Sequence, residues 1–198
     1  MSALLAVMNR KGGAGRTSAT ASLAFLLAER GPVTVLDTDP QGSLARQWLR
    51  EPPDGMRVLH APKELDAALL SLKGTRGAIL AEAPPLDAAR NGALFDAASF
   101  VLVPLSASPL DIGGAAPLLE ALHRGRKRAL CVLWRIDSRA STAILSARRT
   151  LGKYGVPVAE TEVRSRVEWV NAAAEGRGVR GPAREEVESL LKEIEASR

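Results

Sequence analysis

The stretch Asn9-Arg10-Lys11-Gly12-Gly13-Ala14-Gly15-Arg16-Thr17-Ser18 decides the fold that this sequence predicts. An apolar run at 4–8 precedes it, and a helical pattern at 19–29 follows it. The glycines let successive backbone N–H groups turn inward, and the first turn of a helix adds a partial positive charge. A strand, a glycine-rich loop and a helix in this order favour a phosphate-binding loop, in which Thr17 offers its hydroxyl to a magnesium ion. A structural turn without a ligand is the alternative.

Apolar runs alternate with helical patterns along the rest of the chain. We expect further strands at 33–36, 58–60, 78–81, 100–104, 130–133 and 156–158, and further helices at 43–49, 63–72, 118–124, 141–154 and 184–196. Near-continuous apolar strands separated by helices predict an α/β fold with a mostly parallel, twisted sheet that helices flank on both faces. Because no linker or repeat interrupts the pattern, we expect a single domain, 1–198, on which the helix at 184–196 docks.

The composition favours a soluble protein with one well-buried core. The chain has 198 residues, of which 46% are hydrophobic, and this suffices for a single domain. Its single cysteine, Cys131, lies in an apolar run, which excludes a disulfide framework and a cysteine-rich metal site. No stretch approaches the roughly 18 apolar residues of a membrane span, and no signal peptide is visible. We therefore expect a cytoplasmic protein.

The positive charge is concentrated in one part of the chain. The net charge is +5, but residues 121–184 hold fourteen Lys and Arg against five Asp and Glu, which leaves +9 there and −4 elsewhere. Such a basic region is typical of a protein with a polyanionic partner. A solvated, arginine-rich face without a partner explains the same charge, so composition leaves both interpretations open.

Acidic residues follow two of the expected strands. Ligands of parallel sheets bind at the carboxyl ends of the strands, where this chain has Asp37 and Asp39 after 33–36 and Glu82 after 78–81. Carboxylates at that edge suit a hard cation such as Mg²⁺ and the water molecules that it binds. Asp-Pro is also a common turn former, and an acid that merely ends a strand explains Glu82 equally well.

The glycine-rich loop departs from the strict pattern G-x-x-x-x-G-K-[ST], because Arg10 replaces its first glycine and Arg16 replaces its lysine. With Lys11 at its front, the loop resembles the deviant Walker A motif of the ParA/MinD family of dimerising P-loop ATPases. In that family the front lysine reaches across the dimer to the nucleotide of the partner. The resemblance therefore implies a homodimer, a P-loop NTPase fold, and ATP or ADP with Mg²⁺ as ligands.

Other segments carry the same resemblance in order and spacing. The residues Val35 to Gly42 read Val-Leu-Asp-Thr-Asp-Pro-Gln-Gly and resemble the second motif of the family. The segments 102–111 and 161–178 resemble its later motifs, which lie near the nucleotide and the dimer partner. The resemblance spans about 2–180 and is closest to short ParA-type partition ATPases that lack an N-terminal helix-turn-helix domain.

The resemblance also assigns roles to residues. It implies that Lys11, Arg16 and Asp39 are catalytic, with Asp39 orienting the attacking water. It implies that Thr17, Asp37 and Glu82 hold the magnesium ion. The residues implied to bind the nucleotide are Lys11, Gly12, Gly13, Ala14, Gly15, Arg16, Thr17, Ser18 and Arg135.

The function that the resemblance implies is a molecular switch. ATP brings two subunits together, the dimer binds double-stranded DNA non-specifically, and a ParB-like or other cargo adaptor protein triggers hydrolysis. Such a protein is cytoplasmic and nucleoid-associated, and it partitions or positions plasmid or chromosome DNA or another cargo. The basic residues expected to contact DNA are Arg135, Arg139, Arg148, Arg149, Lys153, Arg164 and Arg166.

Three departures from the family pattern predict weak ATP hydrolysis. Arg16 keeps the positive charge of lysine but is planar, longer and forked, so it either binds the phosphates bidentately or clashes with them. Glu82 is one methylene longer than the usual aspartate. Trp134 replaces a small polar residue near the adenine, where its indole either stacks on the base or packs in the core. The alternative function is a catalytically degraded ParA-like interaction or regulatory protein.

Two further function classes have little support. A MinD-like membrane switch needs a basic amphipathic helix at the C-terminus, but the helix at 184–196 is rich in glutamate, so we expect no membrane partner. A metabolic kinase or synthetase has no substrate-specific cluster of residues in this chain. His60 and His123 are isolated in the sequence, and neither has neighbours that indicate a ligand or a general base.

Overall fold

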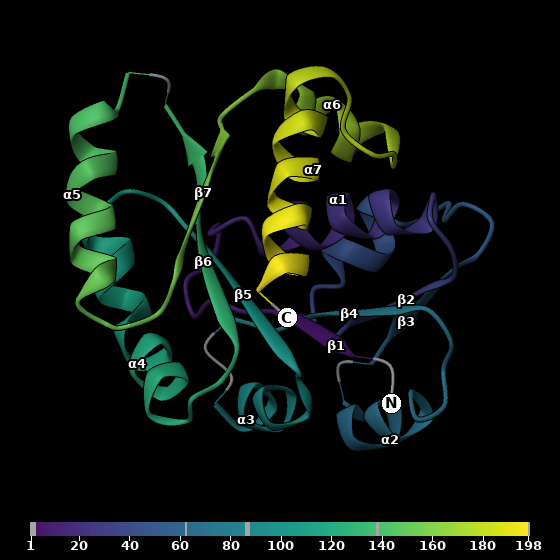
Figure 1. Ribbon diagram of the computed structural model, residues 1–198. Coiled ribbons are helices and arrows are strands. Elements are labelled where there is room, and N and C mark those ends of the chain that lie inside the picture. Colours follow the sequence, from purple (N-terminus) through teal and green to yellow (C-terminus); the bar gives the residue numbers. More distant parts are fainter. Residues whose placement is uncertain (1–2, 62, 86–87, 138, 198) are drawn as a thin grey trace.

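The computed structural model describes residues 3–61, 63–85, 88–137 and 139–197. Within these residues a seven-stranded sheet lies between two layers of helices (Figure 1). The strands are β1 (Leu4–Val7), β2 (Val33–Asp37), β3 (Met56–His60), β4 (Ala78–Glu82), β5 (Phe100–Leu105), β6 (Ala129–Ile136) and β7 (Val158–Arg164). The helical elements are α1 (Arg16–Ala28), the π-helical turn η1 (Leu44–Trp48), α2 (Leu65–Ser71), α3 (Ala88–Ala97), α4 (Pro109–Arg124), α5 (Ser141–Gly152), α6 (Val167–Glu175) and α7 (Gly181–Ala196).

Neighbouring strands of the sheet pair in parallel, in the order β3-β2-β4-β1-β5-β6-β7. The register places Glu82, the last residue of β4, between Asp37 of β2 and Val7 of β1. The loop that follows Val7 therefore begins next to both carboxylates. The predicted fold class, an α/β protein with a parallel sheet flanked by helices on both faces, is confirmed.

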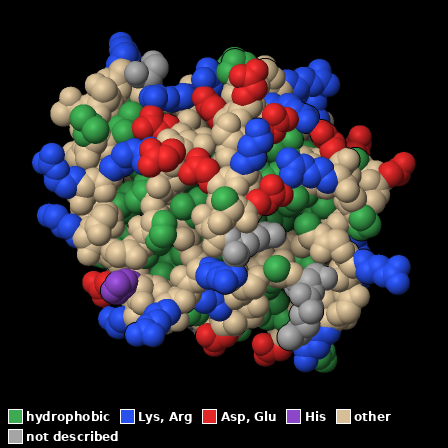
Figure 2. All heavy atoms as spheres, in the orientation of Figure 1, with side chains coloured by type: hydrophobic (Ala, Val, Ile, Leu, Met, Phe, Trp, Pro, Cys, Tyr) green, Lys and Arg blue, Asp and Glu red, His purple; other side chains and the backbone are tan. Residues whose placement is uncertain are grey.

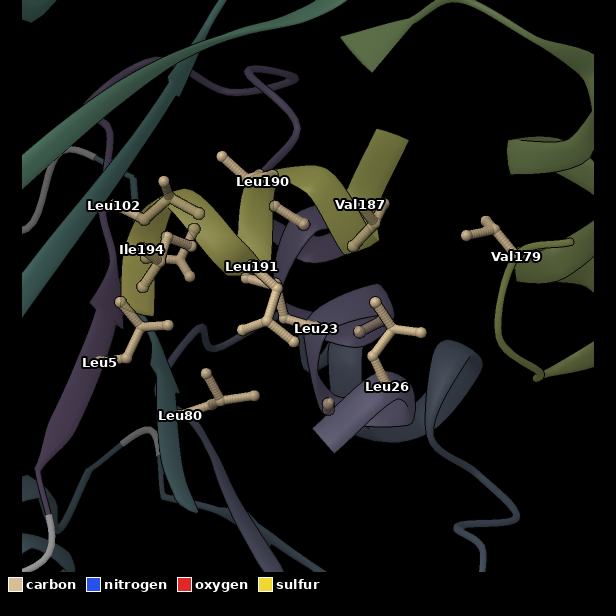
Figure 3. Close-up of a cluster of buried hydrophobic side chains, with 14 of the residues drawn as sticks. Leu5, Leu23, Leu26, Leu80, Leu102, Val179, Val187, Leu190, Leu191 and Ile194 are labelled. Atoms are coloured by element: carbon tan, nitrogen blue, oxygen red, sulfur yellow. The ribbon is translucent and has the colours of Figure 1, made fainter. Parts of the chain in front are cut away.

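Alternate residues of each central strand pack into two separate hydrophobic cores. In β1, Leu5 and Val7 face the core under α1 and α7, whereas Leu4 and Ala6 face the core under α2, α3, α4 and α5. This burial on both sides explains why the central strands read as continuous apolar runs. Figure 3 shows the first core, in which α7 meets α1 and the sheet through Val187, Leu190, Leu191 and Ile194.

The last strand of the sheet differs from its prediction. The apolar run at 156–158 predicts a strand there, but β7 begins at Val158 and continues to Arg164. Only Ala159 and Val163 of β7 are buried, because this strand lies at the edge of the sheet and has polar residues between them. A search for continuous apolar runs misses an edge strand of this kind.

Charged side chains bind backbone groups of β7 where its pairing with β6 is irregular. The carboxylate of Glu193, on α7, accepts the backbone N–H groups of Glu160 at 2.7 Å and Thr161 at 2.8 Å. The guanidinium of Arg148, on α5, donates to the carbonyl oxygens of Ala159 at 2.8 Å and Glu160 at 2.9 Å. These bonds occupy backbone groups that would otherwise be free to pair with another strand.

Several helices differ from their sequence patterns, and α1, for example, begins at Arg16 rather than 19. The helix α4 begins at Pro109 rather than 118, because the two glycines and Pro117 that precede residue 118 conceal the helical pattern. The alanine-rich α3 has no expected counterpart. The helix α7 begins at Gly181 rather than 184, and Pro182 in its first turn presets the backbone angle for a helix. Among the helices that the structure describes, none is long and apolar enough to cross a membrane.

Replacement of Gly77 by alanine should destabilise the fold strongly. Gly77 has φ +86°, and a Cβ atom there would lie 1.9 Å from the carbonyl oxygen of Pro32. Gly74 has a similar φ of +81°, but a Cβ atom there would meet nothing within 4 Å. We expect Gly74→Ala to lower the free energy of unfolding by about 1 kcal/mol and Gly77→Ala by about 3 kcal/mol. If urea denaturation showed equal losses of unfolding free energy for the two variants, the close contact between Gly77, before β4, and Pro32, before β2, would be contradicted.

Candidate nucleotide-binding site

The loop after β1 forms an open cradle at the N-terminus of α1. Gly13 (φ +74°) and Gly15 (φ +94°) take left-handed conformations that only glycine adopts readily. A Cβ atom on Gly12 or Gly13 would meet nothing within 4 Å, so the backbone here borders open space. Asn9 ties the loop to β5, because its side-chain amide donates to the carbonyl of Pro104 at 2.7 Å. Backbone of this shape at a helix N-terminus is suited to an anion.

Arg16 occupies the first turn of α1, and its side chain is only 6% exposed. One terminal nitrogen of its guanidinium donates to the carbonyl oxygens of Asn9 at 2.7 Å and Lys11 at 2.6 Å. Its Nε lies 4.0 Å from Glu82 Oε1 and has no hydrogen-bond partner in the described part of the chain. Burial lowers the pKa of Arg16, and the carboxylate of Glu82 opposes this effect. The guanidinium is thus engaged by the carbonyl groups of the loop itself.

Thr17 and two buried carboxylates meet where β1, β2 and β4 end. The Thr17 hydroxyl donates to Glu82 Oε1 at 2.6 Å, while the buried Oε2 has no partner among the described residues. Asp37 accepts the backbone N–H groups of Asp39 at 3.0 Å and Ala45 at 2.9 Å. Burial raises the pKa of Glu82 to about 8 and also raises that of Asp37. A hydroxyl and a carboxylate oxygen without a partner fit the predicted magnesium site, because Mg²⁺ prefers oxygen ligands.

The loop after β2 contacts a histidine that the sequence leaves isolated. His60 Nε2 lies 3.0 Å from the backbone carbonyl of Asp39, so a protonated Nε2 donates to it. The pairing of β2 with β3 places His60 opposite Asp37, and this register cannot be read from the sequence pattern. Asp39 itself is partly exposed, whereas Asp37 and Glu82 are fully buried. His60 therefore supports the loop that presents Asp39.

Lys11 forms an ion pair with Asp111 in the first turn of α4. Asp111 also accepts a hydrogen bond from the Ser106 hydroxyl at 2.6 Å. Burial would raise the pKa of Asp111, but the hydrogen bonds from Lys11 and Ser106 lower it below its usual value. The side chain of Lys11 is 50% exposed, so a second molecule can still reach its ammonium group.

Trp134 fills the space beneath the glycine-rich loop. Its side chain is fully buried, and a Cβ atom on Gly15 would lie 2.3 Å from its Cδ1. Its Nε1 donates to the hydroxyl of Ser18 at 3.1 Å, and its ring centroid lies 5.2 Å from that of Trp169. Of the two interpretations of Trp134, the structure supports packing in the core. The indole also explains why residue 15 must be glycine.

A small pocket connects the loop to the ends of β6 and β7. Its volume is about 220 Å³, and it is lined by Gly13, Ala14, Ser106, Asp111, Trp134, Arg135 and Ser165. Arg135 is exposed and has φ +58°, a value that is uncommon outside glycine and recurs at functional sites. The structure thus brings Arg135 to the loop, while its contact with a nucleotide stays a prediction.

The basic residues predicted to contact DNA fall into two groups. Three of them form ion pairs within the chain: Arg148 with Glu162 at 3.4 Å, Arg164 with Glu162 at 2.6 Å, and Arg166 with Glu186 at 2.6 Å. The others are exposed, although one of these pairs with Asp137 on the surface; they are Arg135, Arg139, Arg149 and Lys153. The exposed group is more accessible to a polyanion.

Comparison with known proteins agrees with this geometry. A family model described as the CobQ/CobB/MinD/ParA nucleotide binding domain matches residues 5–179. The chain is 32% identical over 207 residues to the maintenance of carboxysome distribution protein A of Halothiobacillus neapolitanus, and the match covers 96% of this chain and 95% of that protein.

Two solved structures share the fold. One is a McdA variant from Cyanothece in complex with ATP, with a TM-score of 0.77, 14% identity, and coverage of 99% of this chain and 96% of that chain. The other is the septum site-determining protein MinD of Pyrococcus horikoshii in complex with Mg-ADP, with a TM-score of 0.78, 18% identity, and coverage of 98% and 96%. At these identities the likeness shows the fold.

Proposed function

Because the chain belongs to the CobQ/CobB/MinD/ParA nucleotide-binding domain family, we propose that it is a ParA-like ATPase that works as a dimerising switch. The open glycine loop carries this proposal, with Lys11 at its front and the contact between Thr17 and Glu82 at its base. We take the whole chain, 1–198, as one functional domain. ATP and Mg²⁺ are its ligands, and its dimer binds DNA non-specifically.

Each residue of the site has a role in this proposal. The backbone N–H groups of 12–17 hold the phosphates of ATP. Thr17 and Glu82, supported by Asp37, hold Mg²⁺, which neutralises phosphate charge when it is bound. Asp39 is partly exposed and orients the attacking water. Lys11 leaves Asp111 and contacts the nucleotide of the partner subunit.

Hydrolysis by this site should be slow without a partner protein. Arg16 donates to the carbonyl groups of Asn9 and Lys11, so its charge is engaged before any phosphate arrives. A point charge directed at the outer phosphates is a large part of phosphoryl-transfer catalysis. We propose that a cargo adaptor, ParB-like or of another kind, raises the rate.

The cargo is proposed from the relatives. The Halothiobacillus neapolitanus protein is named for the maintenance of carboxysome distribution, so a carboxysome or a comparable large assembly is the first candidate. Plasmid or chromosome DNA is the second. In either case the protein would act in the cytoplasm on the nucleoid.

A second candidate function is a ParA-like interaction or regulatory protein that has lost catalysis. The observation in its favour is the engagement of Arg16 by the loop. Such a protein would bind nucleotide weakly or not at all, and its dimer would not depend on ATP.

The experiment that tests the proposed function measures binding of a fluorescent DNA duplex with Mg-ATP, with Mg-ADP and without nucleotide. We expect tight binding with ATP only, with an affinity that falls steeply as salt increases, because phosphate contacts release counterions. A DNA affinity that changes neither with the nucleotide nor with the salt concentration would contradict the switch and favour the second candidate function.

A further inference from the structure

A run of basic residues closes α4 and leads into β6. It reads His123-Arg124-Gly125-Arg126-Lys127-Arg128, and we call Arg124, Arg126 and Arg128 the α4–β6 basic turn. All three arginines are exposed, and Arg126 takes a left-handed conformation with φ +46° where the chain reverses. Figure 2 shows Lys and Arg side chains gathered at the lower left of the molecule, over the region where Figure 1 places the end of α4.

The arginines of this turn are almost free of partners. Arg124 lies 3.6 Å from Glu120 in an exposed pair, which binds an arginine only weakly. The side chains of Arg126 and Arg128 have neither an ion pair nor a hydrogen bond with any residue that the structure describes. This contrasts with Arg148, Arg164 and Arg166, which are held by glutamates.

Lys127 fixes the shape of the turn. Its ammonium donates to the backbone carbonyl of Asp96 at 3.2 Å and lies 5.2 Å from the centroid of the Phe95 ring. Both of these residues lie on the C-terminal part of α3. With Lys127 anchored, Arg126 and Arg128 are presented on a defined backbone rather than on a free loop.

A second exposed basic residue, Lys153, follows α5. A helix that connects two parallel strands ends near the edge of the sheet where the next strand begins. The α4–β6 basic turn precedes β6, and Lys153, at the end of α5, precedes β7, so both lie on this edge. A depression of about 510 Å³ joins the two segments and is lined by His123, Arg126, Lys127, Arg128, Gly155 and Pro157. This edge is opposite the nucleotide site, because the glycine-rich loop follows the carboxyl end of β1.

We propose that the α4–β6 basic turn, together with Lys153, is the surface that contacts the phosphodiester backbone of nucleic acid. This inference rests on the proposed DNA binding and adds where it occurs. Arginine forks match phosphate oxygens bidentately, and free guanidinium groups release counterions from a duplex when they bind. Since nucleotide and DNA occupy opposite edges of the sheet, they do not compete for one site.

The composition of the surface favours nucleic acid over a membrane. Binding to a bilayer surface is strengthened by apolar side chains that enter the lipid. The large exposed apolar residues among those described lie elsewhere: Leu70, Leu110, Leu145, Val167 and Val170. The turn therefore offers charge without an apolar anchor.

The test compares three double variants with the wild type in duplex DNA binding with Mg-ATP over a salt series. Arg126→Gln/Arg128→Gln removes two charges from the turn. Arg139→Gln/Arg149→Gln removes two exposed charges from the basic residues that the sequence indicates. Arg57→Gln/Arg180→Gln removes two exposed charges from other parts of the surface and is the matched control. Thermal melting confirms that each variant is folded.

We expect Arg126→Gln/Arg128→Gln to reduce affinity about tenfold or more and to lower the slope of log affinity against log salt by about 2 for each subunit that contacts the duplex. The control, Arg57→Gln/Arg180→Gln, should change neither the affinity nor the salt slope by a comparable amount. If the wild type binds DNA and Arg126→Gln/Arg128→Gln binds it with the same affinity, this inference is overturned and the proposed function stays intact. A wild type that does not bind DNA would overturn both, as would binding to anionic phosphatidylserine vesicles in place of DNA.

Discussion

Arg16→Lys should raise ATP turnover of the isolated protein by about tenfold or more. In the wild type one terminal nitrogen of the buried guanidinium donates to the carbonyl oxygens of both Asn9 and Lys11, so the charge of Arg16 is directed at the loop itself. A lysine at 16 is shorter and carries a compact charge, which is free to contact the outer phosphates. The measurement is steady-state phosphate release with Mg-ATP.

Arg16→Lys should also destabilise the protein. A gain in turnover together with a loss of stability separates the effect of Arg16 on hydrolysis from its support of the loop. Loss of buried hydrogen bonds lowers the free energy of unfolding by about 1–2 kcal/mol. Arg46→Lys, at an exposed position on η1, is the matched control and should change neither turnover nor stability. A folded Arg16→Lys protein with the turnover of the wild type would show that Arg16 does not limit hydrolysis.

Asp39→Ala should reduce ATP turnover by about 100-fold, while the affinity for ATP changes by less than about threefold. Asp37 is buried and binds backbone N–H groups, and Glu82 is buried against Thr17, so both are assigned to the magnesium ion rather than to the attacking water. Asp39 is partly exposed and borders the same edge of the sheet. The measurements are single-turnover hydrolysis and titration with a fluorescent ATP analogue.

The control for Asp39→Ala is Asp54→Ala, which removes an exposed aspartate from the connection before β3. We expect it to leave both quantities unchanged. If Asp39→Ala instead abolished ATP binding and left the residual rate per bound ATP intact, Asp39 would be a binding residue and its assigned role would be wrong.

The central part of the fold was predictable because its strands are buried on both faces. Runs such as 100–104 are apolar without a break, and the predictions at 4–8, 33–36, 78–81 and 100–104 each agree with the observed strand within one residue. The run at 130–133 covers only part of β6. The edge strand β7 was not predictable in this way, since only Ala159 and Val163 of it are buried. The helix α3 was missed because alanines and few large apolar residues give it a weak helical pattern.

The candidate site was predictable where residues follow a strand directly. The glycine-rich loop, Asp37 and Glu82 come together because β1, β2 and β4 are neighbours in a parallel sheet. The support of Asp39 by His60 needs the register of β2 against β3, and the sequence contains no sign of it. The direction of Arg16 likewise depends on loop carbonyl groups whose positions only the folded backbone defines.

The ion pairs of Arg148, Arg164 and Arg166 show the same limit for surface charge. A count of basic residues does not reveal which of them meet Glu162 or Glu186. Arg164 and Glu162 lie two residues apart on β7, but Arg148 on α5 reaches Glu162, and Arg166 reaches Glu186 on α7, only after the chain has folded. Net charge therefore predicted a polyanionic partner without identifying the accessible residues.

The measurement that tests the dimerising switch most directly is the mass of the Asp39→Ala protein in solution, by light scattering, with Mg-ATP, with Mg-ADP and without nucleotide. We expect about twice the chain mass of 21.0 kDa with ATP and the single chain mass otherwise. Lys11→Ala in the same background should remain a single chain with ATP, because the front lysine then cannot reach the partner. The same mass under all three conditions would contradict an ATP-dependent dimer.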